Sequence, residues 1–272
     1  DLIVIQKKGF FHDLPGHQMT RNSIHTDFIN KKFQKEIAVF NLVYLCYNEP
    51  KTPPTSGISY QIKELTSMQK IRLGRTGLMV TKTAMGCLPV QRCNDEAAIE
   101  LLRAAYDGGI NYFDTANAYS DSEKKIGLAL SDVRDKIIIS TKSAARDKET
   151  VLKHIENSLR MMKTDYIDLF QFHQVTEVPD PNDPNGAYAA ALEAKERGWI
   201  RHIGVTSHRV NIAEQCIASG WFEPLQFPFS YISDERDLAL ADKCREADMG
   251  FIAMKGLAGG MLTNVRACHA FM

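Results

Sequence analysis

The sequence lacks an excess of charge of either sign, and no stretch of it resembles a membrane span. Its 272 residues include 33 basic and 33 acidic side chains, so no net charge draws the chain toward nucleic acid or an anionic membrane surface. No apolar run approaches the roughly 20 residues that cross a bilayer. The composition therefore predicts that the protein binds neither nucleic acid nor membrane.

The sequence also lacks the cysteine pairs and the leader that mark zinc-binding or secreted proteins. Its six cysteines are scattered without a C-x-x-C pair: Cys46, Cys87, Cys93, Cys216, Cys244 and Cys268. This spacing favours reduced thiols over a disulfide framework or a metal site. The opening D-L-I-V-I-Q-K-K lacks the order of a signal peptide, in which basic residues precede a long apolar core. These absences predict a cytoplasmic protein without a metal.

Sustained periodicity is absent from the N-terminal part of the chain. Breakers interrupt its end at Pro50, Pro53, Pro54 and Gly57. From Met68 the pattern changes, because two short strands joined by residues 74–77 predict a β-hairpin. We interpret residues 1–67 as an extension that is non-native or poorly ordered. Residues 68–272 are then the folded domain, and Met68 is its natural first residue.

Strands and helices alternate along that domain. Strands are predicted at 83–88, 112–114, 136–141, 167–173, 200–206, 225–227 and 251–254. Helices are predicted at 95–107, 148–162, 187–197, 210–218 and 235–247, and a further helix after the second strand ends at 130. This alternation implies βαβ units around a parallel sheet. A TIM barrel needs eight strands, and the alternation supplies seven. The predicted fold class is therefore α/β: a (β/α)₈ TIM barrel with an N-terminal β-hairpin, incomplete at the C-terminus. Its first and seventh strands should present unpaired edges.

One segment, N-Y-F-D-T-A-N-A-Y at 111–119, places an acid and a phenol at the end of a strand. Asp114 ends the apolar run, and Tyr119 follows five positions later. Ser120 and Glu123 then have the spacing of a capping box, which predicts a helix start. Ligands bind at this edge of parallel α/β folds, so the segment is a candidate site.

Two further polar residues follow the next strands. Lys142 lies directly after the third strand, and His173 stands where the fourth ends. Taken alone, Asp114 is most simply a loop or cap acid, Tyr119 a packing residue, Lys142 a solvated lysine and His173 a structural histidine. Neighbouring barrel strands direct their ends to one mouth, however. The order of all four therefore points to a shared site.

At these residues the chain resembles the aldo-keto reductases of bacterial type. The resemblance is carried by F-D-T-A-N-A-Y at 113–119, I-S-T-K at 139–142, L-F-Q-F-H at 169–173 and I-G-V-T-S-H at 203–208. It implies reversible hydride transfer between a nicotinamide cofactor and a small carbonyl compound. Tyr119 would donate the proton, and Lys142 would lower the pKa of that phenol. Asp114 would hold Lys142, and His173 would orient the substrate oxygen.

The resemblance also implies cofactor contacts, all at strand ends. They are Gly86, Cys87, Thr206, Ser207, Gln226 and Met254. NADP(H) is favoured over NAD(H), although the segment that would bind the 2′-phosphate in relatives is missing here. His208 either lines the pocket or has a structural role. Because one strand is missing, we expect residues 1–272 to bind cofactor weakly or not at all.

Two other functions fit the pattern. In the first, Lys142 is the Schiff-base amine of a barrel lyase, a reading that gives Tyr119 no role. In the second, the chain binds a nicotinamide cofactor without turnover.

Overall fold

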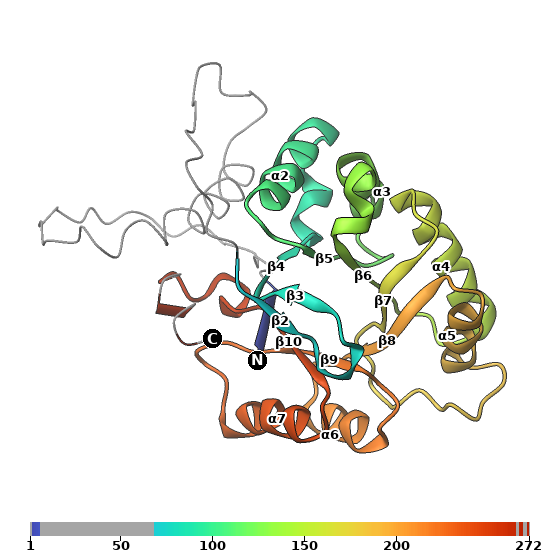
Figure 1. The fold of residues 1–272 in the computed structure, drawn as a ribbon. Coiled ribbons are helices and arrows are strands. Elements are labelled where there is room, and N and C mark those ends of the chain that lie inside the picture. The colour runs from blue at the N-terminus through green and yellow to red at the C-terminus, as the bar shows by residue number, and fades with distance from the viewer. Residues whose placement is uncertain (1, 6–67, 265–266, 269–270, 272) are drawn as a thin grey trace, which may run out of the picture.

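The computed structural model describes residues 2–5, 68–264, 267–268 and 271, and in them eight parallel strands form a closed barrel with helices outside it (Figure 1). The strands run in the order β1-β10-β9-β8-β7-β6-β5-β4 around the ring. They are β1 (Leu2–Ile5), β4 (Thr83–Gly86), β5 (Tyr112–Asp114), β6 (Ile138–Ser143), β7 (Ile167–Phe172), β8 (Ile200–Thr206), β9 (Pro224–Pro228) and β10 (Gly250–Met254). The helices are α2 (Asp95–Asp107), α3 (Ser122–Leu130), α4 (Lys148–Met162), α5 (Ala187–Glu196), α6 (Val210–Ser219) and α7 (Glu235–Glu246). The predicted (β/α)₈ class is confirmed.

Local sequence explains why the longer helices begin where they do. The Asn94 side chain accepts a hydrogen bond from the Ala97 backbone N–H and so caps α2. Asp147 caps α4 in the same way, through the Thr150 N–H. Helix α2 then buries Ala98, Leu101, Leu102 and Ala105, which recur at helical spacing along one face. None of the helices in the described part of the chain is long and apolar enough to cross a bilayer.

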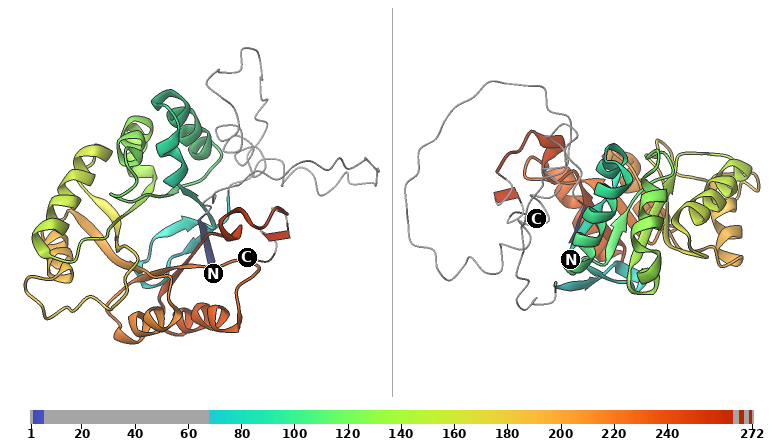
Figure 2. Two further views of the ribbon diagram at one scale, coloured as in Figure 1. Left: turned by 180° about the vertical axis from the view of Figure 1, so that it is seen from behind. Right: turned by 90° about the horizontal axis from the view of Figure 1, so that it is seen from above.

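The predicted hairpin forms from β2 (Lys70–Arg72) and β3 (Met79–Thr81) and covers one end of the barrel. Its apolar side chains share a buried cluster with barrel residues: Ile71, Leu73, Val80, Ala84, Tyr112, Leu169, Ile252 and Met254. Gly74 is required at the turn, because its φ is +50° and an added Cβ would lie 2.1 Å from the Gly250 nitrogen. Figure 2 shows the hairpin at one end of the barrel and the segment after β10 at the other.

The expectation of unpaired edges is wrong, because β1 occupies the eighth position. It pairs in parallel with β10 from Leu2↔Phe251 to Ile5↔Met254 and with β4 at Val4↔Thr83 and Ile5↔Ala84. The pairing satisfies backbone groups that both edges would otherwise leave open. Within the described residues no strand follows β10, which agrees with a barrel incomplete at its C-terminus. The prediction that residues 1–67 are non-native or poorly ordered is not tested, because these residues, except for those of β1, lie outside the described part of the chain.

The predicted capping box at the start of α3 is also wrong. Ser120 has a left-handed φ of 46°, and the N-cap is Asp121, whose side chain makes no capping hydrogen bond. Glu123 instead turns inward, where its Oε1 accepts a hydrogen bond from the Thr141 hydroxyl at 2.5 Å. Burial raises the pKa of the Glu123 carboxyl, and hydrogen bonds from Thr141 and others partly offset that rise. A tertiary partner has thus replaced the local one.

Candidate active site

The barrel brings Asp114, Tyr119, Lys142 and His173 together at the carboxyl ends of its strands. Asp114 ends β5, Lys142 lies in β6 and His173 follows β7, while Tyr119 is in the loop after β5. The Lys142 Nζ lies 2.5 Å from the Asp114 Oδ1 and 5.7 Å from the centre of the Tyr119 ring. The Tyr119 and His173 rings meet edge to face with centroids 5.7 Å apart. All four side chains are buried, and the contacts between them form one cluster.

Lys142 and Asp114 form an ion pair withdrawn from water. Their side chains are 1% and 0% exposed. The Lys142 Nζ also donates to the Thr115 carbonyl oxygen at 2.5 Å. Two buried charges persist together only when they are paired and hydrogen-bonded. The ammonium is therefore held at a defined point beneath the Tyr119 ring.

The loop that carries Tyr119 is tied to β6 through its backbone. The Thr115 N–H donates to the Ser140 carbonyl oxygen at 2.8 Å, and the Asn117 N–H donates to that of Lys142 at 3.0 Å. A turn then closes where the Tyr119 N–H donates to the Ala116 carbonyl oxygen at 2.9 Å. These bonds link the phenol to the strand that supplies the ammonium, so the two groups keep a fixed relation.

The pKa of the Tyr119 phenol is raised above its ordinary value. Burial is the main cause, because a phenolate at this site would lose its hydration. The Lys142 charge lowers the pKa, as the sequence predicts for this pair, while Asp114 raises it. The sequence-based expectation of a lowered pKa is right about the effect of Lys142 but does not include burial, which dominates in the folded chain.

A second set of polar side chains surrounds Asp114 inside the barrel, and sequence reasoning missed most of it. Ser140 and Gln226 both donate to the Asp114 carboxylate, and Gln171 contacts both of these residues. Ser140 and Gln171 lie two residues before Lys142 and His173 along their strands. Alternation along a strand directs such residues to the same face, and that spacing was the available signal.

The other residues with expected cofactor contacts lie around the same mouth. Gly86 pairs with Asp114 in the sheet, and the Cys87 N–H donates to the Asp114 carbonyl oxygen at 2.7 Å. Thr206 pairs with Gln226 across β8 and β9. The positions of the remaining two are also defined: Ser207 Oγ donates to the Val175 carbonyl oxygen at 3.1 Å, and Met254 packs in the barrel interior. His208 is exposed beside them.

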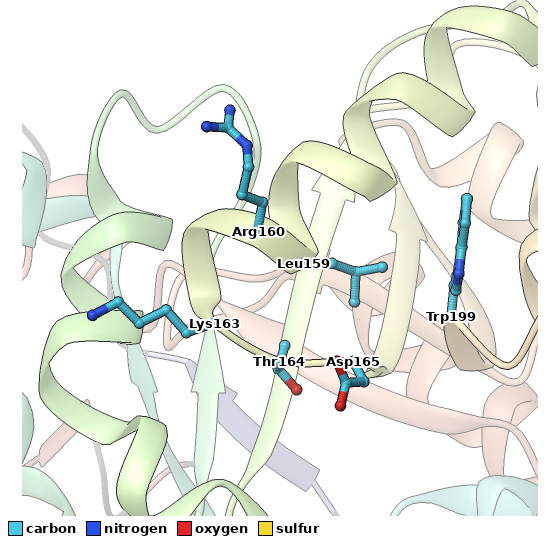
Figure 3. Close-up of a pocket in the computed structure, with 6 residues that line it drawn as sticks. All are labelled: Leu159, Arg160, Lys163, Thr164, Asp165 and Trp199. Carbon is cyan, nitrogen blue, oxygen red and sulfur yellow. The ribbon is translucent and has the colours of Figure 1, made fainter.

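A separate surface hollow of about 440 Å³ lies where α4 leads into β7, at the opposite end of the strands (Figure 3). It is lined by Leu159, Arg160, Lys163, Thr164, Asp165 and Trp199. In Figure 3 the Arg160 and Lys163 side chains extend away from the other lining residues. The hollow lies away from Tyr119, which is at the carboxyl ends of the strands. Within the described ranges, no group of three or more His, Cys, Asp or Glu side chains is placed to hold a metal ion.

Comparison with known proteins agrees with this geometry. The chain is 29% identical to an uncharacterized oxidoreductase, YqkF, of Bacillus subtilis, over 72% of this chain and 67% of that protein. It is 27% identical to the aldo-keto reductase YhdN of the same organism, over 72% and 64%. The chain thus spans about two thirds of the length of these relatives.

Solved structures show the same likeness. The holo form of an aldo-keto reductase from Bacillus halodurans superposes with a TM-score of 0.65 at 27% identity, covering 72% of this chain and 69% of that one. An aldo-keto reductase from Klebsiella pneumoniae in complex with NADPH gives 0.61 at 24% identity, over 72% and 71%, which supports the fold alone. The family model described as "Aldo/keto reductase family" matches residues 76–268, well over half of the chain. The chain therefore belongs to the aldo/keto reductase family of oxidoreductases.

Proposed function

We propose that the protein reduces an aldehyde or ketone to the alcohol, reversibly, with hydride from a nicotinamide cofactor and a proton from Tyr119. The observation that carries this proposal is the buried Lys142–Asp114 pair, whose ammonium lies 5.7 Å from the centre of the Tyr119 ring. A hydride that reaches a carbonyl carbon leaves an alkoxide, which needs a proton as it forms. A phenol beside a fixed cation meets that need.

Burial raises the pKa of the Tyr119 phenol and so makes it a weaker acid, and the Lys142 charge acts against that rise. Once the proton leaves, the Lys142 charge stabilises the phenolate, and Asp114 keeps Lys142 charged and in place. His173, whose ring contacts the Tyr119 ring, donates a hydrogen bond to the same substrate oxygen. Together these groups support negative charge where it develops.

Several residues at the mouth of the barrel suit the binding of a nicotinamide ring. Gly86 has no side chain, so the cofactor ring can approach the backbone beside Asp114. The Thr206 Oγ1 accepts a hydrogen bond from the Gln174 N–H at 2.7 Å, and its own hydrogen can still be donated to a carboxamide oxygen. Cys87 follows Gly86 along the chain and Ser207 follows Thr206, and Met254 offers a thioether surface. When bound, the cofactor supplies the hydride.

The segment after β10 is a further candidate for cofactor contacts. Four of its residues have left-handed backbone: Lys255, Ala258, Gly259 and Gly260. Hydrogen bonds from the Ala258 N–H to the Lys255 carbonyl oxygen at 2.6 Å and from the Gly260 N–H to the Leu257 carbonyl oxygen at 2.8 Å close the turn, and its glycines would let a phosphate approach the backbone closely. We assign the cofactor phosphates to this turn, and we favour NADP(H) over NAD(H). Comparing fluorescence titrations with NADPH and NADH tests the preference, and equal affinity would refute it.

The central test is Tyr119→Phe, with Tyr231→Phe as the matched control because Tyr231 is 63% exposed. Loss of the proton donor should lower the rate of carbonyl reduction by about 10²–10⁴-fold. The affinity for NADPH, measured by fluorescence, should change little. Reduction within a few-fold of the wild-type rate would refute the role of Tyr119.

A Schiff-base lyase is the second candidate, and one observation counts against it. The attacking amine of Lys142 would have to be neutral, whereas its Nζ donates to a buried carboxylate at 2.5 Å. Borohydride trapping of a carbonyl substrate on Lys142 would favour the lyase. A cofactor-binding module without turnover is the third candidate, and NADPH binding without reduction of any carbonyl compound would favour it.

A further inference from the structure

We infer that Gln171 is a positioning residue that sets the orientation of the Asp114 carboxylate and, through it, the place of Lys142. Gln171 lies in β7, two residues before His173, and is fully buried. Among the hydrogen bonds of the described residues, none joins Gln171 to Tyr119 or to the Lys142 ammonium. The inference rests on the proposed function, because positioning matters here for proton transfer from Tyr119.

Four buried side chains from four strands form a closed ring of hydrogen bonds. The Ser140 Oγ donates to the Asp114 Oδ1 at 2.9 Å, and the Gln226 Nε2 donates to the Asp114 Oδ2 at 3.3 Å. The Gln171 Nε2 completes the ring, since it donates to the Ser140 Oγ at 2.8 Å and to the Gln226 Oε1 at 3.1 Å. Each of these side chains is 0% exposed.

The direction of every bond in the ring follows from the charge on Asp114. An ionised carboxylate only accepts hydrogen bonds, so Ser140 and Gln226 must both direct hydrogens toward it. The Ser140 oxygen and the Gln226 carbonyl oxygen are then both acceptors, and each needs a donor. The amide nitrogen of Gln171 carries two hydrogens and serves both acceptors.

The cost of this arrangement falls on Gln171 itself. Its Oε1 is buried and has no hydrogen-bond partner in the described structure. Turning the amide over would place that oxygen against Ser140, whose hydrogen would then leave Asp114. It would also set two carbonyl oxygens, those of Gln171 and Gln226, against each other. The observed orientation therefore leaves one acceptor of Gln171 unsatisfied and keeps both donors on Asp114.

Asp114 transmits this orientation to the reacting groups. The oxygen that accepts from Ser140, Oδ1, also accepts from the Lys142 Nζ at 2.5 Å. If the ring opens, the carboxylate can rotate, and the ammonium beneath Tyr119 moves with it. A displacement of about 1 Å in such a group costs on the order of 100-fold in rate. The expected cofactor contacts other than Gln226 lie outside the ring and need not change.

The first test is steady-state kinetics of carbonyl reduction by the full chain. Gln171→Met keeps the length of the side chain and removes both donors, and Ser140→Ala opens the ring at another point with less change in volume. Each should lower kcat by about 10–100-fold while KM and the Kd for NADPH stay within about three-fold. The double variant should be no slower than the slower single variant, because one ring can be opened only once. Gln215→Met, at an exposed position of α6, is the matched control.

An unchanged kcat would overturn the inference, and so would a parallel loss of kcat, NADPH affinity and melting temperature. The second test does not need activity. A crystal structure of Gln171→Met should show the Asp114 carboxylate rotated away from the Gln226 amide, and an unmoved carboxylate would overturn the inference even if the wild type reduces nothing. An inactive wild type would refute the proposed function instead.

Discussion

Removing one partner of the Lys142–Asp114 pair should destabilise the fold far more than removing both. The two side chains are 1% and 0% exposed, and the Lys142 Nζ lies 2.5 Å from the Asp114 Oδ1. Asp114→Asn leaves a buried ammonium whose remaining contact includes the Thr115 carbonyl oxygen. Breaking a buried pair from one side costs about 3–5 kcal/mol. A domain has about 5–15 kcal/mol in total, so this loss is a large share of the free energy of unfolding.

The double variant separates charge from packing. Lys142→Met alone leaves the Asp114 carboxylate without its cation and should cost a similar amount. In Asp114→Asn/Lys142→Met no buried charge remains, and neutral replacement of a buried pair is often nearly cost-free. The coupling energy, which is the sum of the two single losses minus the loss of the double variant, should therefore reach about 6 kcal/mol or more. Urea unfolding of the four proteins at neutral pH, followed by circular dichroism, measures it. If the two single losses simply add, the account of a mutually dependent pair is refuted.

Two further predictions concern stability away from the mouth. Gly127→Ala should cost about 3 kcal/mol in chemical unfolding, because the added Cβ would lie 2.3 Å from the Met161 carbonyl oxygen; a loss no greater than that of Leu128→Ala, on an exposed part of the same helix, would contradict this. Burial opposes ionisation of Glu223, but hydrogen bonds and charge from His202 and Lys195 outweigh it and lower its pKa to about 2 from an ordinary 4.5. Because the folded pKa is depressed, the stabilisation is present above about pH 4.5 and is lost as the pH falls toward 2. Glu223→Gln should therefore cost about 2 kcal/mol at pH 7, after allowance for partial exposure, with a difference that disappears by pH 2; the same pH profile in the exposed Glu177→Gln would refute the assignment.

Local sequence determined much of this protein. The predicted helices at 95–107 and 148–162 and the strand at 200–206 agree with α2, α4 and β8 at both ends. Capping residues and helical periodicity act over a few positions, so they can be read from neighbours in the chain. The clustering of Asp114, Lys142 and His173 was also predictable, because the ends of parallel strands meet at one mouth of a barrel.

Tertiary structure alone decided the rest. A four-residue apolar run at the N-terminus, β1, does not reveal that it pairs with both β10 and β4, since no local pattern encodes a partner about 250 positions away. Glu123 has the spacing of a capping residue, but a buried hydroxyl on β6 provides its hydrogen bond. The pKa of Tyr119 depends on burial, and the role of Gln171 depends on hydrogens shared among four strands. Such properties arise from distances and solvent exclusion, which the order of residues does not specify.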